Sequence, residues 1–413
     1  MKKGWEIKKL GEICSFLNRG ISPKYIEGGG ICVLNQKCIR GHRVNFEPSR
    51  RHDANAKKVG SERLIQAGDV LVNSTGTGTL GRVAQLRENP SEPTTVDSHV
   101  TIVRPMPGKF YPEFFGYMLI VIEDAIKGAG EGCGGQTELA RSTLAEKFLV
   151  HYPELLLEQR RIVAILDEAF EGIAKAVANT EKNLANAREL FEGYLNSVFS
   201  QGGEGWVEKK LSEVCIVERG SSPRPIRSYL TEDQDGVNWV KIGDTQGVTK
   251  YIHSTKQKIS KEGAEKSRRV NPGDFILTNS MSLGRPYIMA TSGYIHDGWF
   301  VLRLAEEINT DFFYYLLSSR TVQEQFHTLA AGAIVKNISS DLVKKTILPI
   351  PPLAKQEGLI GLIEALSTEV QRLESIYQQK LTALAELKQS LLQKAFSGEL
   401  TARDNNKAKE AAA

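Results

Sequence analysis

The sequence predicts an α+β protein built as a tandem duplication, in which each copy is a mixed α/β domain followed by a long helix. Two segments without proline carry apolar residues at helical spacing, and they recur at a constant offset of 197 residues that aligns Gln159 with Gln356 and Phe199 with Phe396. The globular parts before them share short motifs in the same order. These observations favour two similar domains whose helices form an antiparallel coiled coil.

The first globular part has short apolar runs bounded by Gly, Pro and Asn, which predict strands at Ile31–Leu34, Val70–Asn73 and Val100–Arg104. A helix is expected at Pro112–Ala125. Residues 76–81 fit the dinucleotide-binding pattern GxGxxG, but the RVAQL that follows predicts a strand and not a helix. A tight turn is therefore expected there.

A proline introduces each long helix, as is common at helix starts. At 1.5 Å per residue a helix of about 45 residues spans roughly 65 Å, so it must pack on another helix. Apolar residues in 3-4 alternation predict a coiled-coil seam. The seam residues are Leu166, Phe170, Ile173, Val177, Leu184 and Phe191 in the first helix and Leu366, Val370, Leu373, Leu381, Leu384 and Leu391 in the second, where Leu387 is also expected at the seam.

The second half repeats the first with changes. GWEIKKLGE at 4–12 recurs as GWVEKKLSE at 205–213, and the GD-to-LGR segment at 68–82 recurs at 273–285. Expected elements are strands at Val237–Ile242, Phe275–Thr278 and Trp299–Leu304 and a helix at Asp311–Phe326. Segments 24–66 and 224–271 share almost nothing. Two domains that recognise different targets would show this pattern, as would surface loops whose sequences have diverged without selection.

The resulting organisation has five parts. They are a first domain (1–152), a central helix (153–200), a second domain (201–350), a second helix (351–400) and a polar, alanine-rich tail (401–413) expected to be disordered. If the ends of the second domain lie close together, as domain termini often do, the second helix returns antiparallel to the first.

Composition excludes several classes of protein. The five cysteines form no CxxC pair, which indicates neither a disulfide framework nor a zinc site. No signal peptide or membrane span is apparent, so a cytoplasmic protein is expected. Residues 1–65 hold 14 Lys and Arg against 6 Asp and Glu, whereas helix residues 154–200 hold 5 against 8. Basic globular parts suit a phosphate-facing surface, although a solvated surface would look similar.

No catalytic or metal-binding pattern stands out. GxxxxGK[ST] is missing, as is the Asn-Pro-Pro-aromatic motif of amino-methyltransferases, and no acidic partner accompanies Glu6-Ile7-Lys8 as a nuclease would require. His99 and His296 each lie near an aspartate, Asp97 and Asp297, without a nucleophile in both copies. A structural role or a DNA contact is expected for these histidines, and the chain is expected to be non-catalytic.

Polar side chains in the loops are candidate DNA contacts, because Arg and Lys pair with guanine, Asn and Gln with adenine, and Ser with phosphate. Residues at matching places in both halves are expected to grip phosphate or to stabilise a turn; they are Arg19, Ser22, Asn73, Ser74, Arg82, Gln136, Arg219, Ser222, Asn279, Ser280, Arg285, Lys336 and Asn337. Base readers are expected in the divergent segments; the candidates there are Lys24, Asn35, Gln36, Lys37, Arg40, Arg224, Lys241 and Asp244.

The doubled motifs, with LPIPPLAKQEGLI at 348–360, its variant HYPELLLEQRRIV at 151–163 and the helix ends AFSGEL and VFSQGG, resemble the specificity subunit of Type I restriction-modification systems over essentially the whole chain. The resemblance implies two target recognition domains that each bind half of an interrupted sequence in double-stranded DNA. It implies that the helices set the gap and dock two modification subunits.

In that scheme this chain holds no cofactor. The modification subunits would hold S-adenosylmethionine and methylate adenine at N6, and restriction subunits would add translocation and cleavage driven by ATP and Mg²⁺. The alternative is a coiled-coil adaptor that binds proteins and does not recognise a DNA sequence. Steep salt dependence of DNA affinity would distinguish the two.

Overall fold

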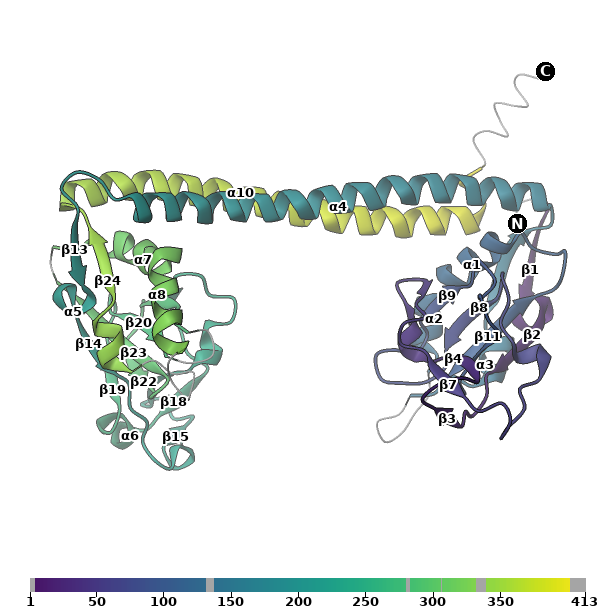
Figure 1. Ribbon diagram of the computed structural model, residues 1–413, viewed down its shortest axis with the longest axis horizontal. Helices are drawn as coiled ribbons and strands as arrows, with labels where there is room; N and C mark the ends of the chain where they lie inside the picture. Colours follow the sequence, from purple (N-terminus) through teal and green to yellow (C-terminus); the bar gives the residue numbers. More distant parts are fainter. Residues whose placement is uncertain (1–3, 131–136, 280–282, 306, 332–338, 402–413) are drawn as a thin grey trace, which may run out of the picture. The chain divides into compact units, whose positions relative to one another are not determined.

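The computed structural model describes residues 4–130, 137–279, 283–305, 307–331 and 339–401 and divides into two compact units (Figure 1). Unit 1 comprises residues 1–179 and 379–413, and unit 2 comprises residues 180–378. Each unit contains one globular domain and the adjoining parts of both long helices. The candidates Gln136, Ser280, Lys336 and Asn337 and the tail from residue 402 lie outside the described residues.

In unit 1 the strands are β1 (Trp5–Lys9), β2 (Cys14–Arg19), β3 (Tyr25–Ile26), β4 (Ile31–Leu34), β5 (Ile39–Arg40), β6 (Arg43–Val44), β7 (Arg50–His52), β8 (Val70–Asn73), β9 (Val83–Gln85), β10 (Thr94–Val96), β11 (Val100–Pro105) and β12 (Leu149–Pro153). The short helices are α1 (Pro112–Val121), α2 (Glu123–Gly128) and α3 (Arg141–Glu146). The long helix α4 (Leu156–Gln201) begins here.

The main sheet of unit 1 is antiparallel with strand order β2-β11-β8-β9. Side chains of a strand alternate between the two faces of its sheet. Val70 and Val72 of β8 join the core that contains α1 and the long helices, whereas Leu71 joins a second core with the smaller sheet β10-β4-β7-β3. The main sheet is therefore the middle layer of the unit, and the two-stranded ribbon β1-β12 leads into α4.

In unit 2 the strands are β13 (Val207–Lys210), β14 (Cys215–Arg219), β15 (Leu230–Thr231), β16 (Val237–Val240), β17 (Tyr251–Ile252), β18 (Gln257–Ile259), β19 (Arg268–Val270), β20 (Phe275–Thr278), β21 (Pro286–Met289), β22 (Gly293–Ile295), β23 (Trp299–Leu304) and β24 (Ile347–Ile350). The helices are α5 (Leu211–Val214), α6 (Lys261–Glu265), α7 (Thr310–Ser318), α8 (Arg320–Ala331), α9 (Ser340–Lys344) and the long α10 (Leu353–Ser397).

Unit 2 repeats the layering of unit 1. Its main sheet has the order β14-β23-β20-β21-β17, and its second sheet has the order β15-β18-β16-β22-β19. Phe275 and Leu277 of β20 face the core shared with α7 and the long helices, and Ile276 faces the second sheet. The fold is thus a tandem duplication of an α+β domain with a long helix.

The two long helices run antiparallel. In unit 1, Thr401, just beyond α10, hydrogen bonds Glu158 of α4, and Lys388 lies 5.2 Å from the Phe170 ring centroid. In unit 2, Arg188 of α4 pairs with Glu374 of α10 at 2.5 Å. The α10 partner number falls as the α4 number rises, which defines the antiparallel direction.

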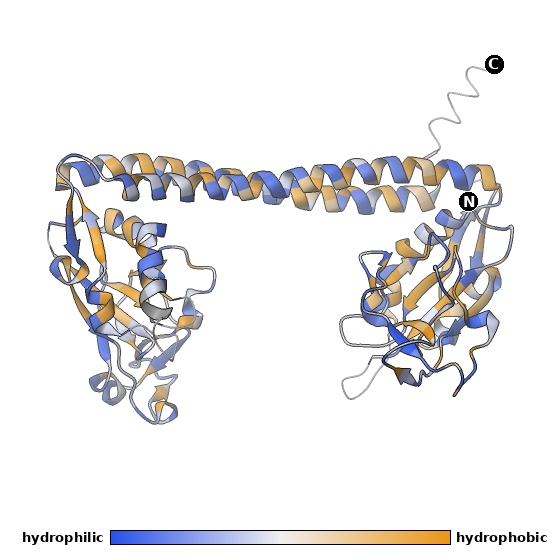
Figure 2. Ribbon diagram, viewed as in Figure 1, coloured by the Kyte–Doolittle hydropathy of each residue, from blue (hydrophilic) through white to orange (hydrophobic). Residues whose placement is uncertain are grey.

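The seam has the predicted apolar character, and apolar residues recur along both helices in Figure 2. Of the twelve main seam residues predicted, Leu166 and Val370 are buried and the other ten are partly buried. The prediction for Leu387 is wrong, since this side chain is 47% exposed. Its neighbour Lys388 contacts Phe170 instead, because the 3-4 spacing of the second copy is less regular here.

The expected strands are confirmed at Val70–Asn73, Phe275–Thr278 and Trp299–Leu304, but the two expected short helices are interrupted. The backbone at Ile122 leaves helical geometry between α1 and α2. Ser319, between α7 and α8, has an extended ψ of 150°, and its hydroxyl donates to Leu316 O at 2.6 Å. None of the helices in the described part of the chain is long and apolar enough to cross a membrane.

Candidate nucleic-acid interface

The polar candidates gather in the loops at one end of the strands of each main sheet. In unit 1 the chain leaves β2 after Arg19, leaves β8 after Asn73 and enters β11 at Val100, and the antiparallel register brings these points together. Gly20 N–H donates to Val100 O at 3.0 Å, and Ser74 N–H donates to His99 O at 2.8 Å. We call this loop cluster, residues 19–24, 35–37, 73–82 and 97–99, the loop end of domain 1.

The turn after β8 is built by two fully buried candidates. Asn73 Nδ2 donates to Gln36 O at 3.2 Å, and the backbone of Asn73 bonds Arg82 O and Gly81 N–H. Ser74 Oγ lies 2.5 Å from Thr101 Oγ1. These two side chains support the turn from inside and are not on the exposed surface. Gly76, Gly78 and Gly81 have positive φ, so the expected tight turn is confirmed.

Neighbouring candidates brace the same loops. Asn35 caps a short 3₁₀ helix by accepting from Lys37 N–H at 2.9 Å, and its Nδ2 donates to Pro48 O at 2.7 Å. Gln36 Nε2 donates to Thr75 O at 2.8 Å. Arg19 donates to Leu139 O at 2.9 Å and pairs with Glu138 at 2.7 Å. The loop end is consequently held to the sheet by its own polar side chains.

Three further candidates lie on the outer side of the cluster. The backbone carbonyl of Ser22 accepts a hydrogen bond from Lys57 Nζ at 3.0 Å. Lys24 is exposed, and its Nζ lies 3.7 Å from the Asp53 carboxylate. Arg82 donates to Gly78 O at 2.9 Å. An ion pair as long as 3.7 Å contributes little stability at an exposed position. The Lys24 ammonium can therefore leave Asp53 and bind a phosphate with little loss of free energy.

The hairpin β5-β6 of domain 1 also carries exposed cations. Arg40 and Arg43 are directly opposite each other in the hairpin, and within the described chain neither they nor exposed Lys37 has an ion-pair partner. Like charges directly opposite destabilise a ladder unless an anion lies between them. Sequence reasoning missed Arg43. The signal was the tetrapeptide RGHR, because Gly41 and His42, both with positive φ, form the two-residue turn that brings the arginines face to face.

The loop end of domain 2 is organised around Asp297. Its carboxylate accepts from Ser222 Oγ at 2.5 Å and pairs with exposed Arg224 at 3.5 Å. Its backbone carbonyl accepts from Asn279 Nδ2 at 2.6 Å and from Arg219 Nε at 3.2 Å. The Ser222 hydrogen bond lowers the pKa of Asp297. Asn279 is buried, so it supports the loop in the same way as Asn73 in domain 1.

The two candidate histidines are not equivalent. Val100 and Trp299 begin the matching strands β11 and β23, so Asp97 corresponds in position to His296. His99 Nδ1 lies 2.8 Å from Thr75 Oγ1 on the loop surface. Burial raises the pKa of Asp97.

His296 is partly buried in domain 2. Its Nδ1 accepts from Gly298 N–H at 2.9 Å, and its ring centroid is 6.2 Å from those of Trp239 and Trp299. Burial lowers the pKa of His296, which favours the neutral imidazole that these contacts require.

The remaining candidates of domain 2 include one structural carboxylate. Asp244 accepts from Lys241 N–H at 2.8 Å and from Lys256 N–H at 3.1 Å, which ties the loop after β16 to the strand β18. The Lys241 ammonium is exposed and donates to Gln257 at 3.3 Å. Exposed Arg285 donates to Val248 O at 3.3 Å. Lys241 and Arg285 therefore present cationic groups on a braced loop surface.

Domain 2 also carries exposed cations that sequence reasoning did not single out. Arg227, Lys256 and Arg269 are exposed, and over the residues that the structure describes they have no ion-pair partner. Rigid loops that carry uncompensated Lys and Arg together with amide side chains can bind phosphates and base edges. Among the described residues no group of His, Cys, Asp or Glu side chains could hold a metal ion.

Comparison with known proteins gives a consistent result. The family described as "Type I restriction modification DNA specificity domain" matches residues 2–183 and 203–382. The chain is 26% identical over 214 residues to the Type I restriction enzyme EcoKI specificity subunit of Escherichia coli strain K12, covering 49% of this chain and 45% of that relative. It is 23% identical over 344 residues to the EcoBI specificity subunit of Escherichia coli, covering 76% and 71%.

A solved structure shares the fold along the full length. A chain from a study of complex assembly and conformational transition of the type I R-M system matches with a TM-score of 0.80 at 18% identity, covering 97% of this chain and 99% of that chain. The alignment with the EcoKI subunit spans about half of that relative's length, whereas this structural match spans nearly all of both chains.

Proposed function

Because this chain belongs to the Type I restriction modification DNA specificity domain family, we propose that it is the non-catalytic subunit that selects the DNA target of a Type I restriction-modification complex. Each globular domain reads one half of an interrupted site in double-stranded DNA. The long helices set the number of base pairs between the halves. The site is asymmetric, because the exposed residues of the two domains differ.

The observation that carries this proposal is the repetition of the loop end. Asn and Arg side chains brace the same loops in both domains. Arg19 and Asn73 hold the loops after β2 and β8 in domain 1, and Arg219 and Asn279 hold the loops after β14 and β20 in domain 2. Most of the exposed cations, in contrast, come from the segments 24–66 and 224–271, which differ in sequence; Arg219 and Arg285 are exposed cations outside them. A common frame with different surfaces suits two readers of different half-sites.

The proposed partners are two modification subunits and restriction subunits. S-adenosylmethionine for adenine methylation and ATP with Mg²⁺ for translocation and cleavage are then bound by those partners in the cytoplasm. Exposed leucines near the start of α4, Leu155 at 71% and Leu157 at 79%, support docking of a protein there.

Selection from a library of random DNA duplexes tests the proposal. We expect the chain, co-purified with its modification subunits, to enrich two short motifs separated by a fixed number of unspecified base pairs. Recovery of one uninterrupted motif would contradict the two-reader proposal. Recovery of no motif would favour the alternative, a coiled-coil protein adaptor.

Salt dependence of affinity gives the first testable prediction. For B-DNA the slope of log K against log salt is about −0.9 per neutralised phosphate, so Arg40→Gln with Arg43→Gln should make the slope about 1 to 2 less negative. Arg372→Gln is the matched control, because Arg372 is an exposed arginine paired with Glu369 on α10. A slope unchanged by the hairpin substitutions would exclude the hairpin from the DNA contact.

A further inference from the structure

Each long helix carries a buried glutamine in its first turns. Gln159 of α4 is 0% exposed. Its Oε1 accepts from Tyr111 N–H at 2.8 Å, and its Nε2 donates to Pro153 O at 2.9 Å and to Lys109 O at 3.3 Å. One side chain therefore joins the long helix to the end of β12 and to the segment that leads into α1.

The second helix repeats this arrangement at the offset of 197 residues. Gln356 of α10 is 1% exposed. Its Oε1 accepts from Asn309 N–H at 2.9 Å, and its Nε2 donates to Pro351 O at 3.0 Å and to Glu307 O at 3.5 Å. In both copies the two amide hydrogens and the carbonyl oxygen are all used, so the side chain has one defined orientation.

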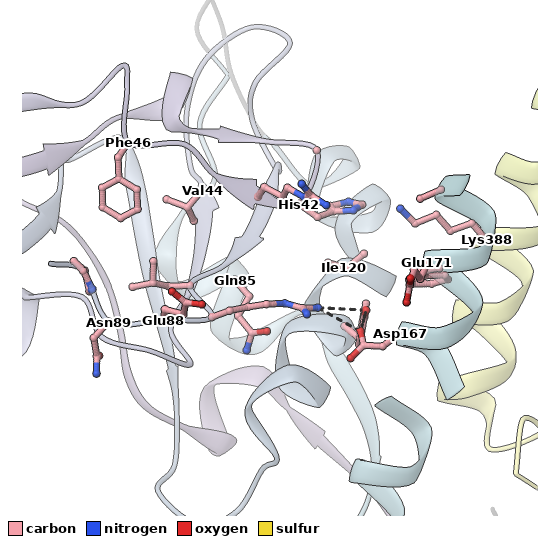
Figure 3. A pocket seen from close by; sticks show the side chains of 18 of the residues that line it. His42, Val44, Phe46, Gln85, Glu88, Asn89, Ile120, Asp167, Glu171 and Lys388 are labelled. Carbon is pink, nitrogen blue, oxygen red and sulfur yellow. Dashed lines mark hydrogen bonds and ion pairs between the residues drawn. The ribbon is translucent and has the colours of Figure 1, made fainter. Parts of the chain in front are cut away.

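A second contact joins each globular domain to its helix. In the groove of unit 1 drawn in Figure 3, Asp167 of α4 is linked to the globular domain by dashed contacts. The Tyr117 hydroxyl donates to Asp167 at 2.5 Å, and Arg87 lies 3.6 Å from the same carboxylate and 5.8 Å above the tyrosine ring. Burial and the hydrogen bond to Asp167 raise the pKa of Tyr117 to about 12.

Unit 2 has the corresponding contact with different residues. Glu364 of α10, 197 positions after Asp167, lies 3.6 Å from Lys250 Nζ. Lys250 also pairs with Asp311 of α7 at 2.5 Å and lies 5.0 Å from the ring centroid of Tyr315, the counterpart of Tyr117. Both helices thus hold their domain at two separated points, a buried amide and a carboxylate about two turns further along.

Each domain shares an apolar core with the long helices, and the two separated polar contacts add a defined angle between the domain and its helix to that packing. Hydrogen bonds contribute this directional precision, whereas apolar burial is non-directional. On DNA the tolerance is narrow, because one base pair moves the next contact by about 3.4 Å and turns it by roughly 35°. A small change in domain angle therefore changes which gap length fits.

We propose that Gln159 and Gln356 are positioning residues that set the gap length read by the complex, by fixing the angle at which each recognition domain is held on its helix. This inference rests on the proposed function. It differs from a role in stability alone, because a loosened angle alters the relative affinity for different gaps while the half-site sequences stay the same.

The test uses Gln356→Met in the full-length chain with its modification subunits, since methionine retains the length and helix propensity but removes both hydrogen-bonding groups. Gln371→Met is the matched control, because Gln371 is exposed on the same helix and, among the residues that the structure describes, hydrogen bonds only Ser367. The probes are fluorescent duplexes carrying the selected half-sites with gaps one or two base pairs shorter or longer.

We expect wild type and Gln371→Met to prefer one gap by about tenfold or more over its neighbours, comparable to the cost of one mismatched base pair. Gln356→Met should reduce this ratio at least about threefold or move the optimum by one base pair. An unchanged ratio, or equal weakening at every gap, would overturn the inference.

A second variant covers the case in which Gln356→Met does not fold. Tyr117→Phe removes only the hydroxyl that bonds Asp167 and keeps the ring, which packs 5.6 Å from Phe170. The same loss of gap preference is expected, and a folded Tyr117→Phe chain with the wild-type profile would overturn the inference. If wild type itself selects no interrupted site, the proposed function fails and not the inference about the glutamines.

Discussion

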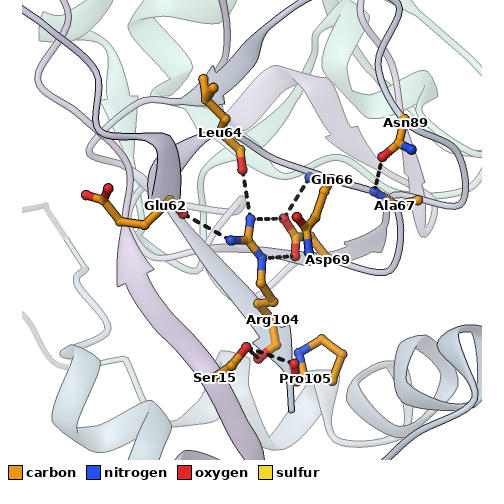
Figure 4. A network of polar contacts seen from close by, with 9 residues as sticks. All are labelled: Ser15, Glu62, Leu64, Gln66, Ala67, Asp69, Asn89, Arg104 and Pro105. Carbon is orange, nitrogen blue, oxygen red and sulfur yellow. Dashed lines mark hydrogen bonds and ion pairs between the residues drawn. The ribbon is translucent and has the colours of Figure 1, made fainter. Parts of the chain in front are cut away.

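At the scale of single residues, Asp69 of the repeated GD motif forms an ion pair with Arg104 of β11, which holds the main sheet to the turn before β8. Asp69 is fully buried and accepts two hydrogen bonds from Arg104, at 2.7 Å from Nε and 2.8 Å from a terminal nitrogen (Figure 4). Arg104 also donates to Leu64 O at 2.8 Å, and Asp69 caps the turn by accepting from Gln66 N–H at 2.9 Å. The sequence marks the motif as shared without revealing this pairing.

Replacing Arg104 by Leu should lower the free energy of unfolding of unit 1 by about 3–5 kcal/mol, because it leaves a buried carboxylate without its cation. Arg303→Leu in unit 2 is the matched comparison. There Asp274 remains 12% exposed and lies 3.4 Å from Arg303, so the loss should be smaller. Hydrogen exchange of β8 and β20 measures the two units separately, and equal losses would contradict the prediction.

Glu123 gives unit 1 a dependence on acid pH. Burial alone would raise the pKa of Glu123, but hydrogen bonds from His42, Lys127 and the backbone N–H of Val83 outweigh it and lower the pKa to about 2. The unfolded value is about 4.3, and each pKa unit corresponds to about 1.36 kcal/mol, so the ionised carboxylate contributes roughly 3 kcal/mol.

This contribution is present above the unfolded pKa and is lost as the pH falls from about 4.3 toward 2. We therefore expect Glu123→Gln to flatten the acid limb of the stability profile of unit 1. Asp124→Asn, at the exposed neighbouring position, should retain it. Urea denaturation between pH 3 and 7 measures both variants, and identical acid limbs for wild type and Glu123→Gln would show that the ion pairs contribute nothing.

At the scale of elements, the long helices contain glycines that nothing in the fold requires. A Cβ at Gly172 or Gly193 would meet no atom within 4 Å, and neither residue has positive φ. Glycine in a helix interior costs about 0.5–1 kcal/mol relative to alanine. Gly172→Ala and Gly193→Ala should each raise the free energy of unfolding by that amount.

Gly81→Ala is the contrasting variant for this measurement. Gly81 has a φ of +81°, and a Cβ there would lie 2.6 Å from the Lys127 side chain, so alanine should destabilise unit 1. Thermal denaturation of the three variants would contradict the prediction if the helix glycines and Gly81 responded alike.

The sequence predicts elements well where a single periodicity persists and fails where a local contact interrupts it. The strands around Val70 and Phe275 face a core on each side, so they occur as short runs of consecutive apolar residues, and these runs predicted them. The interruption at Ser319 was not, because apolar spacing continues across it and the hydroxyl bond to Leu316 O is invisible in sequence.

The candidate sites divide in the same way. From the sequence, Asn73 was predicted to grip phosphate or stabilise a turn because it is shared between the halves, and Arg40 to read bases because it lies in a divergent segment. Only the structure shows that Asn73 is buried and Arg40 exposed. Glutamine is common on the exposed faces of helices, so nothing about Gln159 alone predicts that it is buried. Only its recurrence as Gln356 indicates a shared role. Pairings between distant residues, such as Tyr117 with Asp167, depend on tertiary packing and need the structure.

At the scale of the whole molecule, helix length should control the gap between half-sites. Four residues inserted beside Asn183 of α4, matched by four beside Tyr377 in the facing part of α10, lengthen both helices by about 6 Å, slightly more than one turn. We expect the selected site to gain one or two base pairs in its gap and to keep both half-sites. Methylation mapping of cells expressing the variant measures this.

The single-sided insertion is the control. Four residues in α4 alone shift the seam against α10, so binding should weaken at every gap length with no new optimum. A doubly lengthened chain that still reads the original gap would contradict the role of the helices as a spacer.

The core of the first domain includes Leu392, Ala395 and Phe396 of α10, with the Phe396 ring 5.0 Å from that of Phe114. A ribosome adds these side chains only after it has made the second domain. At about 5–20 residues per second, the first domain (residues 1–152) waits roughly 12–50 s for them after its own residues have been made. During that interval Phe114 lacks its native cover, and a nascent chain that stops early can never supply it. Synthesis of α10 is therefore a condition for closing the first domain, which is made before the second domain but matures after it.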